Sequence, residues 1–254
     1  MKEILTLNAI SPVAAEALGG NYILSDKAEN PAGIMLRSFS MHDYALPDSV
    51  VAVARAGAGT NNIPSAEYAQ KGVVVFNTPG ANANAVKELV LAALFASGRK
   101  LAESLEWVNS IADQGDEIPK LVEKGKKNFV GHELLGKTIG IIGLGAIGAK
   151  VANATEAIGM KVLGYDPYLS VDNALSLTRK IKRATSLDEI AANADYVTVH
   201  VPLLADNKGF LNKNFFAKMK DGAVLVNLAR GELVNNDDVI AAVESGKLAK
   251  YVCD

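Results

Sequence analysis

One six-residue run constrains the fold of this chain more than any other feature: Gly143-Leu144-Gly145-Ala146-Ile147-Gly148. It follows an apolar run at 138–142 and precedes a segment with helical periodicity, so it stands where a strand turns into a helix. In such a turn the first glycine permits the tight bend, the second allows a ligand to approach the backbone, and the third lets helix and strand pack closely. The sequence therefore predicts a βαβ unit whose helix N-terminus offers free amide groups to an anion.

Asp166 extends this prediction from an anion to a dinucleotide. It stands at the end of the next predicted strand, 161–165, where a carboxylate can accept hydrogen bonds from both hydroxyls of an adenosine ribose. The same carboxylate repels a 2′-phosphate, by about a few kcal/mol for two unit charges near a surface, so the pattern favours NAD over NADP. The alternatives are a ligand-free turn for the glycines and a simple turn residue before Pro167 for Asp166.

Short apolar runs alternate with helix-like segments in both halves of the chain, a rhythm typical of parallel sheets covered by helices. The predicted strands are 4–7, 33–36, 50–55, 73–77, 137–142, 161–165, 196–201, 223–228 and 250–253. The predicted helices are 12–18, 64–72, 82–110, 147–158, 213–219 and 236–245, with a short helix opening at the capping box of Ser186. The polar segment 113–127 is predicted to be a surface excursion.

Composition excludes several classes of protein. The chain is 49% hydrophobic and 21% charged with a net charge of -2, so disorder, collagen and a nucleic-acid surface are not expected. A single cysteine, Cys253, excludes an internal disulfide and a Cys-rich metal site, and that cysteine is expected to pack on a strand. The N-terminus lacks the pattern of a signal peptide, and the apolar stretch 89–96 is too short to span a bilayer. We expect a cytoplasmic protein with no membrane partner and no metal.

Further motifs carry a resemblance to a known family. The glycine turn is followed by Gly164-Tyr165-Asp166-Pro167, then Val199-His200-Val201-Pro202-Leu203, then Asn227-Leu228-Ala229-Arg230-Gly231-Glu232-Leu233-Val234. In this order the motifs resemble the D-isomer-specific 2-hydroxyacid dehydrogenases. The resemblance implies two doubly wound parallel-sheet α/β domains, a flavodoxin-like substrate domain at 1–82 and a Rossmann NAD-binding domain at 83–254, with a cleft between them.

The first-half motifs 36–38, 55–63 and 77–82 are, within this family, most similar to those of the phosphoglycerate dehydrogenases. This implies NAD-dependent oxidation of D-3-phosphoglycerate to 3-phosphohydroxypyruvate, the first step of serine biosynthesis. The alternatives are another D-2-hydroxyacid dehydrogenase, acting on lactate, glycerate or a branched 2-hydroxy acid, and a non-catalytic NAD(H)-binding module. The apolar stripe of the 82–110 helix implies a homodimer.

The resemblance also assigns roles to residues. Arg230 is the catalytic arginine, which would hold the substrate carboxylate, and Arg37 would meet the 3-phosphate. The other substrate-binding residues are Ser38, Gly57, Ala58 and Asn82. The cofactor-binding residues are Gly143, Gly145, Ala146, Ile147, Gly148, Asp166, His200, Val201, Pro202, Leu228, Ala229 and Asp254.

Each of these roles has a simpler alternative. Arg230 and Arg37 can be ordinary surface cations, residues 57–59 a plain tight turn, and Asn82 a helix cap. Without the resemblance, His200 is the natural choice for a general acid/base, because it ends a strand at the same sheet edge as Arg230. The resemblance instead places His200 beside the cofactor.

The family pattern departs from this sequence in two places. Ala146 stands where many relatives have an Arg or Lys that reaches the pyrophosphate. The family's catalytic Glu and His, and the segment that completes the substrate domain, have no counterpart up to Asp254. We therefore expect this chain to bind NAD with impaired turnover.

Overall fold

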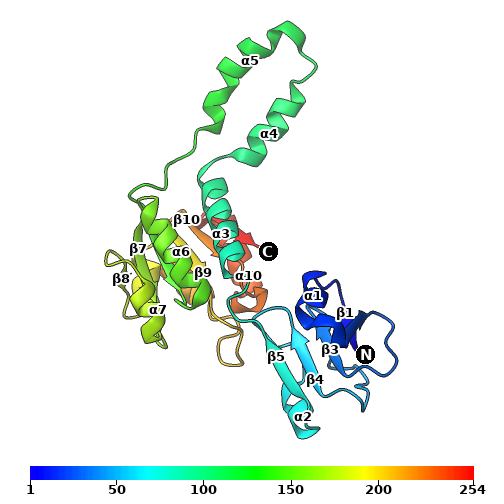
Figure 1. Cartoon of the computed structure of the whole chain (residues 1–254). Helices are drawn as coiled ribbons and strands as arrows, with labels where there is room; N and C mark the ends of the chain where they lie inside the picture. The colour runs from blue at the N-terminus through cyan, green and yellow to red at the C-terminus, as the bar shows by residue number, and fades with distance from the viewer. The chain divides into compact units, whose positions relative to one another are not determined.

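The computed structural model describes all 254 residues and divides them into two compact units, Met1–Asn82 and Ala83–Asp254 (Figure 1). Each unit contains one parallel β-sheet with helices packed on it. An α/β fold with two doubly wound sheets is therefore confirmed.

The sheet of the N-terminal unit has five strands in the order β2-β1-β3-β4-β5. This is the flavodoxin-like order. The largest buried side chains of its core come from β3, the following loop and the first helix after β4, and include Ile34, Leu36, Met41 and Tyr68. The elements of this unit are β1 (Lys2–Leu7), α1 (Val13–Leu18), η1 (Gly19–Asn21), β2 (Tyr22–Ser25), β3 (Gly33–Leu36), β4 (Ala52–Arg55), α2 (Ser65–Gln70) and β5 (Val74–Asn77).

Strand β2 is the one strand of this unit that the sequence pattern did not predict. It has four residues, none of them buried, and it pairs only with β1 at the edge of the sheet. Its apolar run, Tyr22-Ile23-Leu24, is shorter than the about four to eight residues by which a buried strand is recognised, which explains the omission.

The sheet of the C-terminal unit has six parallel strands in the order β11-β10-β9-β6-β7-β8. The chain order reverses between β6 and β9, which pair directly, as in the Rossmann fold. The strands are β6 (Thr138–Ile142), β7 (Lys161–Tyr165), β8 (Lys182–Arg183), β9 (Tyr196–Val199), β10 (Ala223–Asn227) and β11 (Leu248–Cys253). The helices are α3 (Ala83–Gly98), α4 (Leu101–Ser110), η2 (Gly115–Glu117), α5 (Ile118–Gly125), η3 (Lys126–Phe129), α6 (Ala146–Ala157), α7 (Val171–Ser176), α8 (Leu187–Asn193), α9 (Lys213–Lys218), η4 (Gly231–Leu233) and α10 (Asn236–Glu244).

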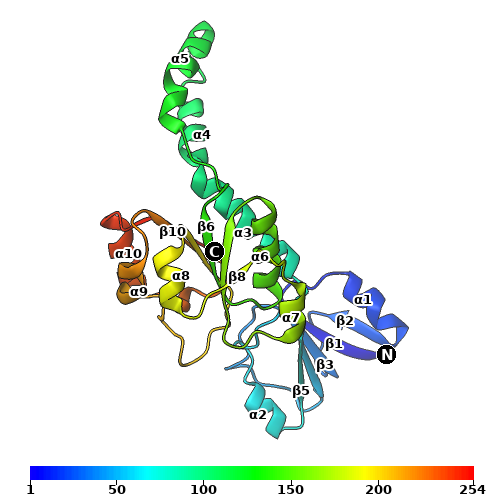
Figure 2. The same cartoon turned by 90° about the vertical axis from the view of Figure 1, so that its left-hand side faces the viewer.

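Helices cover both faces of this sheet. Figures 1 and 2 show α3 and α6 packed on one face, and α8, α9 and α10 lie on the other. Every residue of the central strands β9 and β10 is buried, as expected for strands with helices on both sides. The loops that follow β9 and β10 at the carboxyl edge of the sheet are therefore attached to fully buried strands.

The predicted helix at 82–110 is wrong as a single helix. The structure breaks it into α3 and α4 at Arg99–Lys100. At the break the carbonyl of Gly98 accepts a hydrogen bond from the amide of His132 at 2.9 Å, and Gly98 is itself a weak helix former. A contact from a residue 34 positions later in the chain therefore ends a helix whose apolar periodicity continues across the break.

The polar segment 113–127, predicted as a surface excursion, is largely helical. It contains η2, α5 and the start of η3, and Trp107 of α4 stacks on Phe129 with ring centroids 5.1 Å apart. In both views α4 and α5 extend beyond the sheet of their unit (Figures 1 and 2). Pro119 stands in the first turn of α5, where proline favours helix rather than breaking it.

Two smaller findings complete the fold. Cys253 lies in β11, but its side chain is exposed, so the expectation that it packs as a buried residue is wrong. Strand β11 is at the edge of the sheet, where one side lacks a neighbour. None of the helices has both the length and the apolar character needed to cross a membrane.

Candidate functional site

The loops that follow β6, β7, β9 and β10 meet at one edge of the C-terminal sheet, because parallel strands share the edge at which they end. The glycine turn follows β6, Asp166 follows β7, His200 follows β9 and Arg230 follows β10. The reversal of strand order between β6 and β9 lies at the centre of this edge. Open α/β sheets bind ligands at such a reversal point.

The three glycines of the turn have three different environments. Gly143 has φ 91°, and a Cβ there would lie 2.8 Å from the carbonyl oxygen of His200. A Cβ at Gly148 would overlap the carbonyl oxygen of Gly143. Gly145 is the exception, because a Cβ there would meet no atom within 4 Å. Packing alone therefore explains Gly143 and Gly148, whereas Gly145 borders open space that a ligand can enter.

The N-terminus of α6 faces this open space without a side-chain cap. Its N-cap residue is Gly145, and no side chain accepts a hydrogen bond from the first turn of the helix. The first amide groups of a helix have no partner within the helix, and together they carry about half a positive charge. The backbones of Ala146 and Ile147 thus offer free N–H groups. Because residue 146 is alanine, no cationic side chain stands at this position to assist them.

Asp166 is held against the glycine turn by two backbone hydrogen bonds. Its Oδ2 accepts from the amide of Leu144 at 2.8 Å, and its Oδ1 accepts from the amide of Tyr168 at 2.8 Å. Each carboxylate oxygen retains a free lone pair. The turn therefore fixes the position of the carboxylate while leaving acceptors for two ligand hydroxyls.

His200 is a neutral residue at this edge. Burial lowers the pKa of His200 to about 4, its Nε2 lies 3.0 Å from the hydroxyl of Thr198, and its amide donates to the carbonyl of Ile142 at 2.7 Å. A general acid/base works best with a pKa near the ambient pH, so this environment argues against His200 as the proton carrier. Val201 and Pro202 continue from it in the same loop.

Arg230 lies in a loop that a buried asparagine organises. Asn227, the last residue of β10, is 2% exposed. Its Nδ2 donates to the carbonyl of Arg230 at 2.8 Å, and its Oδ1 accepts from the amide of Ala229 at 3.1 Å. The Arg230 guanidinium donates to the carbonyl of Ala229 at 2.8 Å. Asn227 was missed as a functional candidate, although a polar residue ending an otherwise apolar strand was a usable signal.

A second cluster of loops meets at the carboxyl edge of the N-terminal sheet. Asn8, which follows β1, has φ 82°, and its Oδ1 accepts from the amides of Arg37 and Phe39 at 3.3 and 2.8 Å. The carbonyl of Arg37 in turn accepts from Arg55 Nε at 3.0 Å and from Asn62 Nδ2 at 3.2 Å. These bonds fix the backbone of Arg37, while its side chain is exposed.

The other predicted substrate-binding residues lie in the same unit. The amide of Gly57 (φ 152°) donates to the hydroxyl of Thr78 at 2.8 Å, and the carbonyl of Ala58 accepts from Asn77 Nδ2 at 2.7 Å. Ser38 is exposed beside Arg37, and Asn82 is the last residue of the unit. Sequence reasoning gave no role to Asn8, an isolated asparagine in a loop, or to Asn62, which lies within the 55–63 motif.

Comparison with known proteins identifies the family. Residues 91–254 match the family model described as D-isomer specific 2-hydroxyacid dehydrogenase, NAD binding domain. The chain belongs to this family. The resemblance and the NAD-binding assignment of the second domain are thus confirmed, and NAD is the cofactor of that domain.

Relatives within the family carry several names. The chain is 37% identical over 202 residues to a D-3-phosphoglycerate dehydrogenase of Archaeoglobus fulgidus, covering 80% of this chain and 36% of that protein. It is 37% identical over 196 residues to a hydroxypyruvate reductase of Thermotoga maritima, covering 77% and 58%. The crystal structure of D-mandelate dehydrogenase from Rhodotorula graminis superposes with a TM-score of 0.76 and 25% identity, covering 100% and 81%.

The length of the match limits what these names establish. The match spans only about a third of the length of the D-3-phosphoglycerate dehydrogenases. Family membership therefore establishes the fold and the cofactor, while the substrate varies among the relatives.

The residues at the carboxyl edge of the C-terminal sheet fit NAD. The open space at Gly145 and the uncapped start of α6 suit a pyrophosphate. The fixed carboxylate of Asp166 suits the hydroxyls of a ribose. The predicted cofactor residues Leu228 and Ala229 follow β10 at this edge, and Asp254 follows β11. Their contacts with NAD remain predictions.

Proposed function

We propose that this chain takes part in the NAD-dependent oxidation of D-3-phosphoglycerate to 3-phosphohydroxypyruvate. The observation that carries the proposal is the glycine turn, in which a Cβ is excluded at Gly148 by the protein itself and meets only open space at Gly145. The 37% identity to a D-3-phosphoglycerate dehydrogenase supports the choice of substrate.

The residues at the carboxyl edge of the C-terminal sheet would bind and orient the cofactor. The amides at the start of α6 would hold the pyrophosphate, and Asp166 would accept hydrogen bonds from the ribose hydroxyls. His200 is neutral at physiological pH, since burial lowers its pKa to about 4, and would line the site without adding charge. When bound, NAD supplies the hydride acceptor, so the protein's part is orientation and electrostatics.

Arginine side chains would recognise the substrate. The planar guanidinium of Arg230 can hold a carboxylate through two parallel hydrogen bonds and polarise the neighbouring carbonyl. Arg37, exposed at the end of β3, would bind the 3-phosphate, with Ser38, Gly57, Ala58 and Asn82 completing the substrate contacts. Asn8 would act as a positioning residue, because its side chain fixes the backbone on both sides of Ser38.

Calorimetric titration tests the cofactor part of this proposal. The chain should bind NAD, and NADP should bind at least about tenfold more weakly, because two like charges about 4 Å apart near a surface repel by a few kcal/mol. Equal affinity for the two dinucleotides would contradict the role given to Asp166. Absence of heat with both would contradict the site.

The substrate part requires a separate titration. Arg37→Ala should weaken binding of 3-phosphoglycerate to the NAD-loaded chain by about tenfold or more, which corresponds to one charge-assisted hydrogen bond. Binding of unphosphorylated D-glycerate should not change, and NAD affinity should stay as in the parent chain. Unchanged affinity for 3-phosphoglycerate would refute the phosphate role of Arg37.

A second substrate class has a specific observation in its favour. The relative from Thermotoga maritima, also 37% identical, is named a hydroxypyruvate reductase. If the NAD-loaded chain binds D-glycerate as tightly as 3-phosphoglycerate, this alternative replaces the first.

We also propose that the chain forms a homodimer through α3 and α4. Five large apolar side chains on these helices are 48–64% exposed: Leu89, Phe95, Leu101, Leu105 and Val108. A helix face that stays apolar and exposed marks an interaction site. Light scattering should give a dimer for the parent chain and a monomer for Leu101→Gln/Leu105→Gln. A parent chain that is monomeric at all concentrations tested would overturn the proposal.

A further inference from the structure

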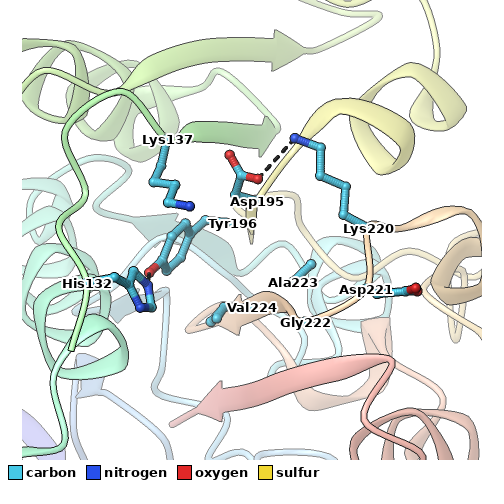
Figure 3. A pocket seen from close by; sticks show the side chains of 9 residues that line it. All are labelled: His132, Lys137, Asp195, Tyr196, Lys220, Asp221, Gly222, Ala223 and Val224. Atoms are coloured by element: carbon cyan, nitrogen blue, oxygen red, sulfur yellow. Dashed lines mark hydrogen bonds and ion pairs between the residues drawn. The ribbon is translucent and has the colours of Figure 1, made fainter. Parts of the chain in front are cut away.

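Figure 3 shows a small pocket. It lies at the amino edge of the C-terminal sheet, where β6, β9 and β10 begin, whereas the glycine turn lies at the carboxyl edge. Its volume is about 170 Å³. His132 and Lys137 reach it from the segment before β6, Asp195 and Tyr196 from the start of β9, and Lys220 from the turn before β10. The dinucleotide site does not involve any of these side chains.

The carboxylates around the pocket already have cationic partners. Asp195 accepts from Lys220 Nζ at 3.0 Å and from the amide of Thr138 at 2.7 Å. Asp221 pairs with Lys247 at 2.7 Å, is 90% exposed, and points away from the pocket in Figure 3. Nowhere in the chain do three or more His, Cys, Asp or Glu side chains gather closely enough to hold a metal ion. The pocket is therefore not built for a cation.

The ammonium groups around the pocket keep hydrogen-bond donors that are not used by protein acceptors. Lys137 has no carboxylate within ion-pairing distance, and in Figure 3 its ammonium group lies beside the ring of Tyr196. An ammonium group has three N–H donors, so Lys220 retains two after it pairs with Asp195. Two cationic side chains therefore reach one pocket with donors to spare.

His132 and Tyr196 add one more donor, whichever tautomer the histidine adopts. His132 Nε2 lies 2.6 Å from the hydroxyl of Tyr196, and burial raises the pKa of Tyr196, so the phenol keeps its proton. If the phenol donates to Nε2, the histidine Nδ1–H is free; if Nε2–H donates, the phenol O–H is free. In both arrangements, the pair keeps one hydrogen that is not used between the two side chains.

We propose that this pocket binds a tetrahedral oxyanion, either free phosphate or the phosphate of a small phosphomonoester. Lys137, Lys220 and the His132–Tyr196 pair supply the donors, and the paired state of Asp195 limits its repulsion. At about 30 Å³ per water molecule, a pocket of about 170 Å³ has room for a phosphate and one or two waters. It is smaller than the roughly 300 Å³ at which pockets for larger ligands begin, which excludes a dinucleotide.

Amide NMR spectra of the ¹⁵N-labelled chain test the proposal at constant ionic strength. Titration with inorganic phosphate should shift the amides of Lys137, Tyr196 and Gly222 in a saturable way. A parallel titration with glycerol phosphate separates the two sources, since tighter binding than inorganic phosphate indicates a phosphomonoester. Shifts at Gly145 and Ile147 would report the dinucleotide site instead, so the two sites are read independently.

Two variants that each remove one lysine charge, one in the pocket and one outside it, decide whether phosphate binds in the pocket. Lys137→Gln should weaken phosphate binding about tenfold or more, as expected for a charge-assisted hydrogen bond, and Lys137→Arg should restore it. The control is Lys161→Gln, which removes another exposed lysine at the same sheet edge and should leave the affinity unchanged. Equal weakening by Lys137→Gln and Lys161→Gln, or no saturable shift in the parent chain, would overturn the proposal.

Discussion

Replacing Gly145 by alanine separates the ligand-binding role of the glycine turn from its structural role. The backbone at Gly145 has φ −69° and ψ −162°, a conformation that alanine adopts without strain. The added methyl would meet no protein atom within 4 Å. The folded chain should therefore accept the substitution, and the methyl should occupy the space in which we place the pyrophosphate.

The size of the two effects follows from this geometry. The free energy of unfolding should change by less than about 1 kcal/mol, because two effects oppose each other. Alanine restricts the unfolded chain, which stabilises the fold by about 0.4–1 kcal/mol, but it is a poorer N-cap than glycine. Loss of one charge-assisted amide hydrogen bond to the pyrophosphate costs about 1.5–3 kcal/mol. This predicts that the Kd for NAD rises by about ten- to a hundredfold.

Calorimetry with NAD and urea unfolding of the same preparation measure both quantities. Gly20→Ala is the matched control, since a Cβ there also meets open space; it should leave NAD affinity unchanged and alter stability by no more than about 1 kcal/mol. Gly148→Ala should behave in the opposite way. Its methyl overlaps the carbonyl oxygen of Gly143, which should destabilise the fold by about 1–3 kcal/mol or more. Unaltered NAD affinity in Gly145→Ala would refute the placement of the pyrophosphate.

Three further predictions rest on single side chains. Asp166→Asn should raise NADP affinity relative to NAD, since it removes the charge that repels a 2′-phosphate; an unchanged ratio of Kd values in calorimetry would count against this role. His200 has a pKa of about 4 against 6.5 for an unperturbed histidine, so the unfolded chain binds the proton first as the pH falls. The stability that His200 contributes is complete above pH 6.5 and is lost between pH 6.5 and 4, by up to roughly 3 kcal/mol; urea unfolding of His200→Asn should show a shallower pH dependence, and an identical slope would rule this out. Ser186→Ala removes the acceptor for the Glu189 amide at 3.1 Å and should lower stability by about 1 kcal/mol, measured by thermal unfolding with Ser186→Thr as the variant that keeps the cap.

Much of the fold was predictable because local signals and tertiary structure agree. The strands β3 and β7 begin and end where the sequence pattern placed them, and the Ser186 cap is formed. These segments combine buried apolar runs with clear turn residues. The strands β2 and β8 were not predicted, since both are short, exposed edge strands.

Part of the candidate site could be proposed from a sequence motif. The glycine turn and Asp166 could be recognised because their spacing reflects the geometry of one βαβ unit. Asn8 had no such signal, and the only local signal at Asn227 was a polar residue at the end of an apolar strand. Their importance comes from the amides and carbonyls that they contact in loops folded around them, and a single asparagine in a sequence does not indicate those partners.

The sequence by itself determined the α/β class, the glycine turn between β6 and α6 and the family, because each depends on residues that are neighbours along the chain or lie at fixed spacing. Only the tertiary structure decided where the helix at 82–110 breaks and which side chains reach the pocket beside Tyr196. Both depend on His132, whose amide meets Gly98 and whose ring meets Tyr196. Contacts between residues 34 and 64 positions apart form only when the chain is folded, and no local pattern records them.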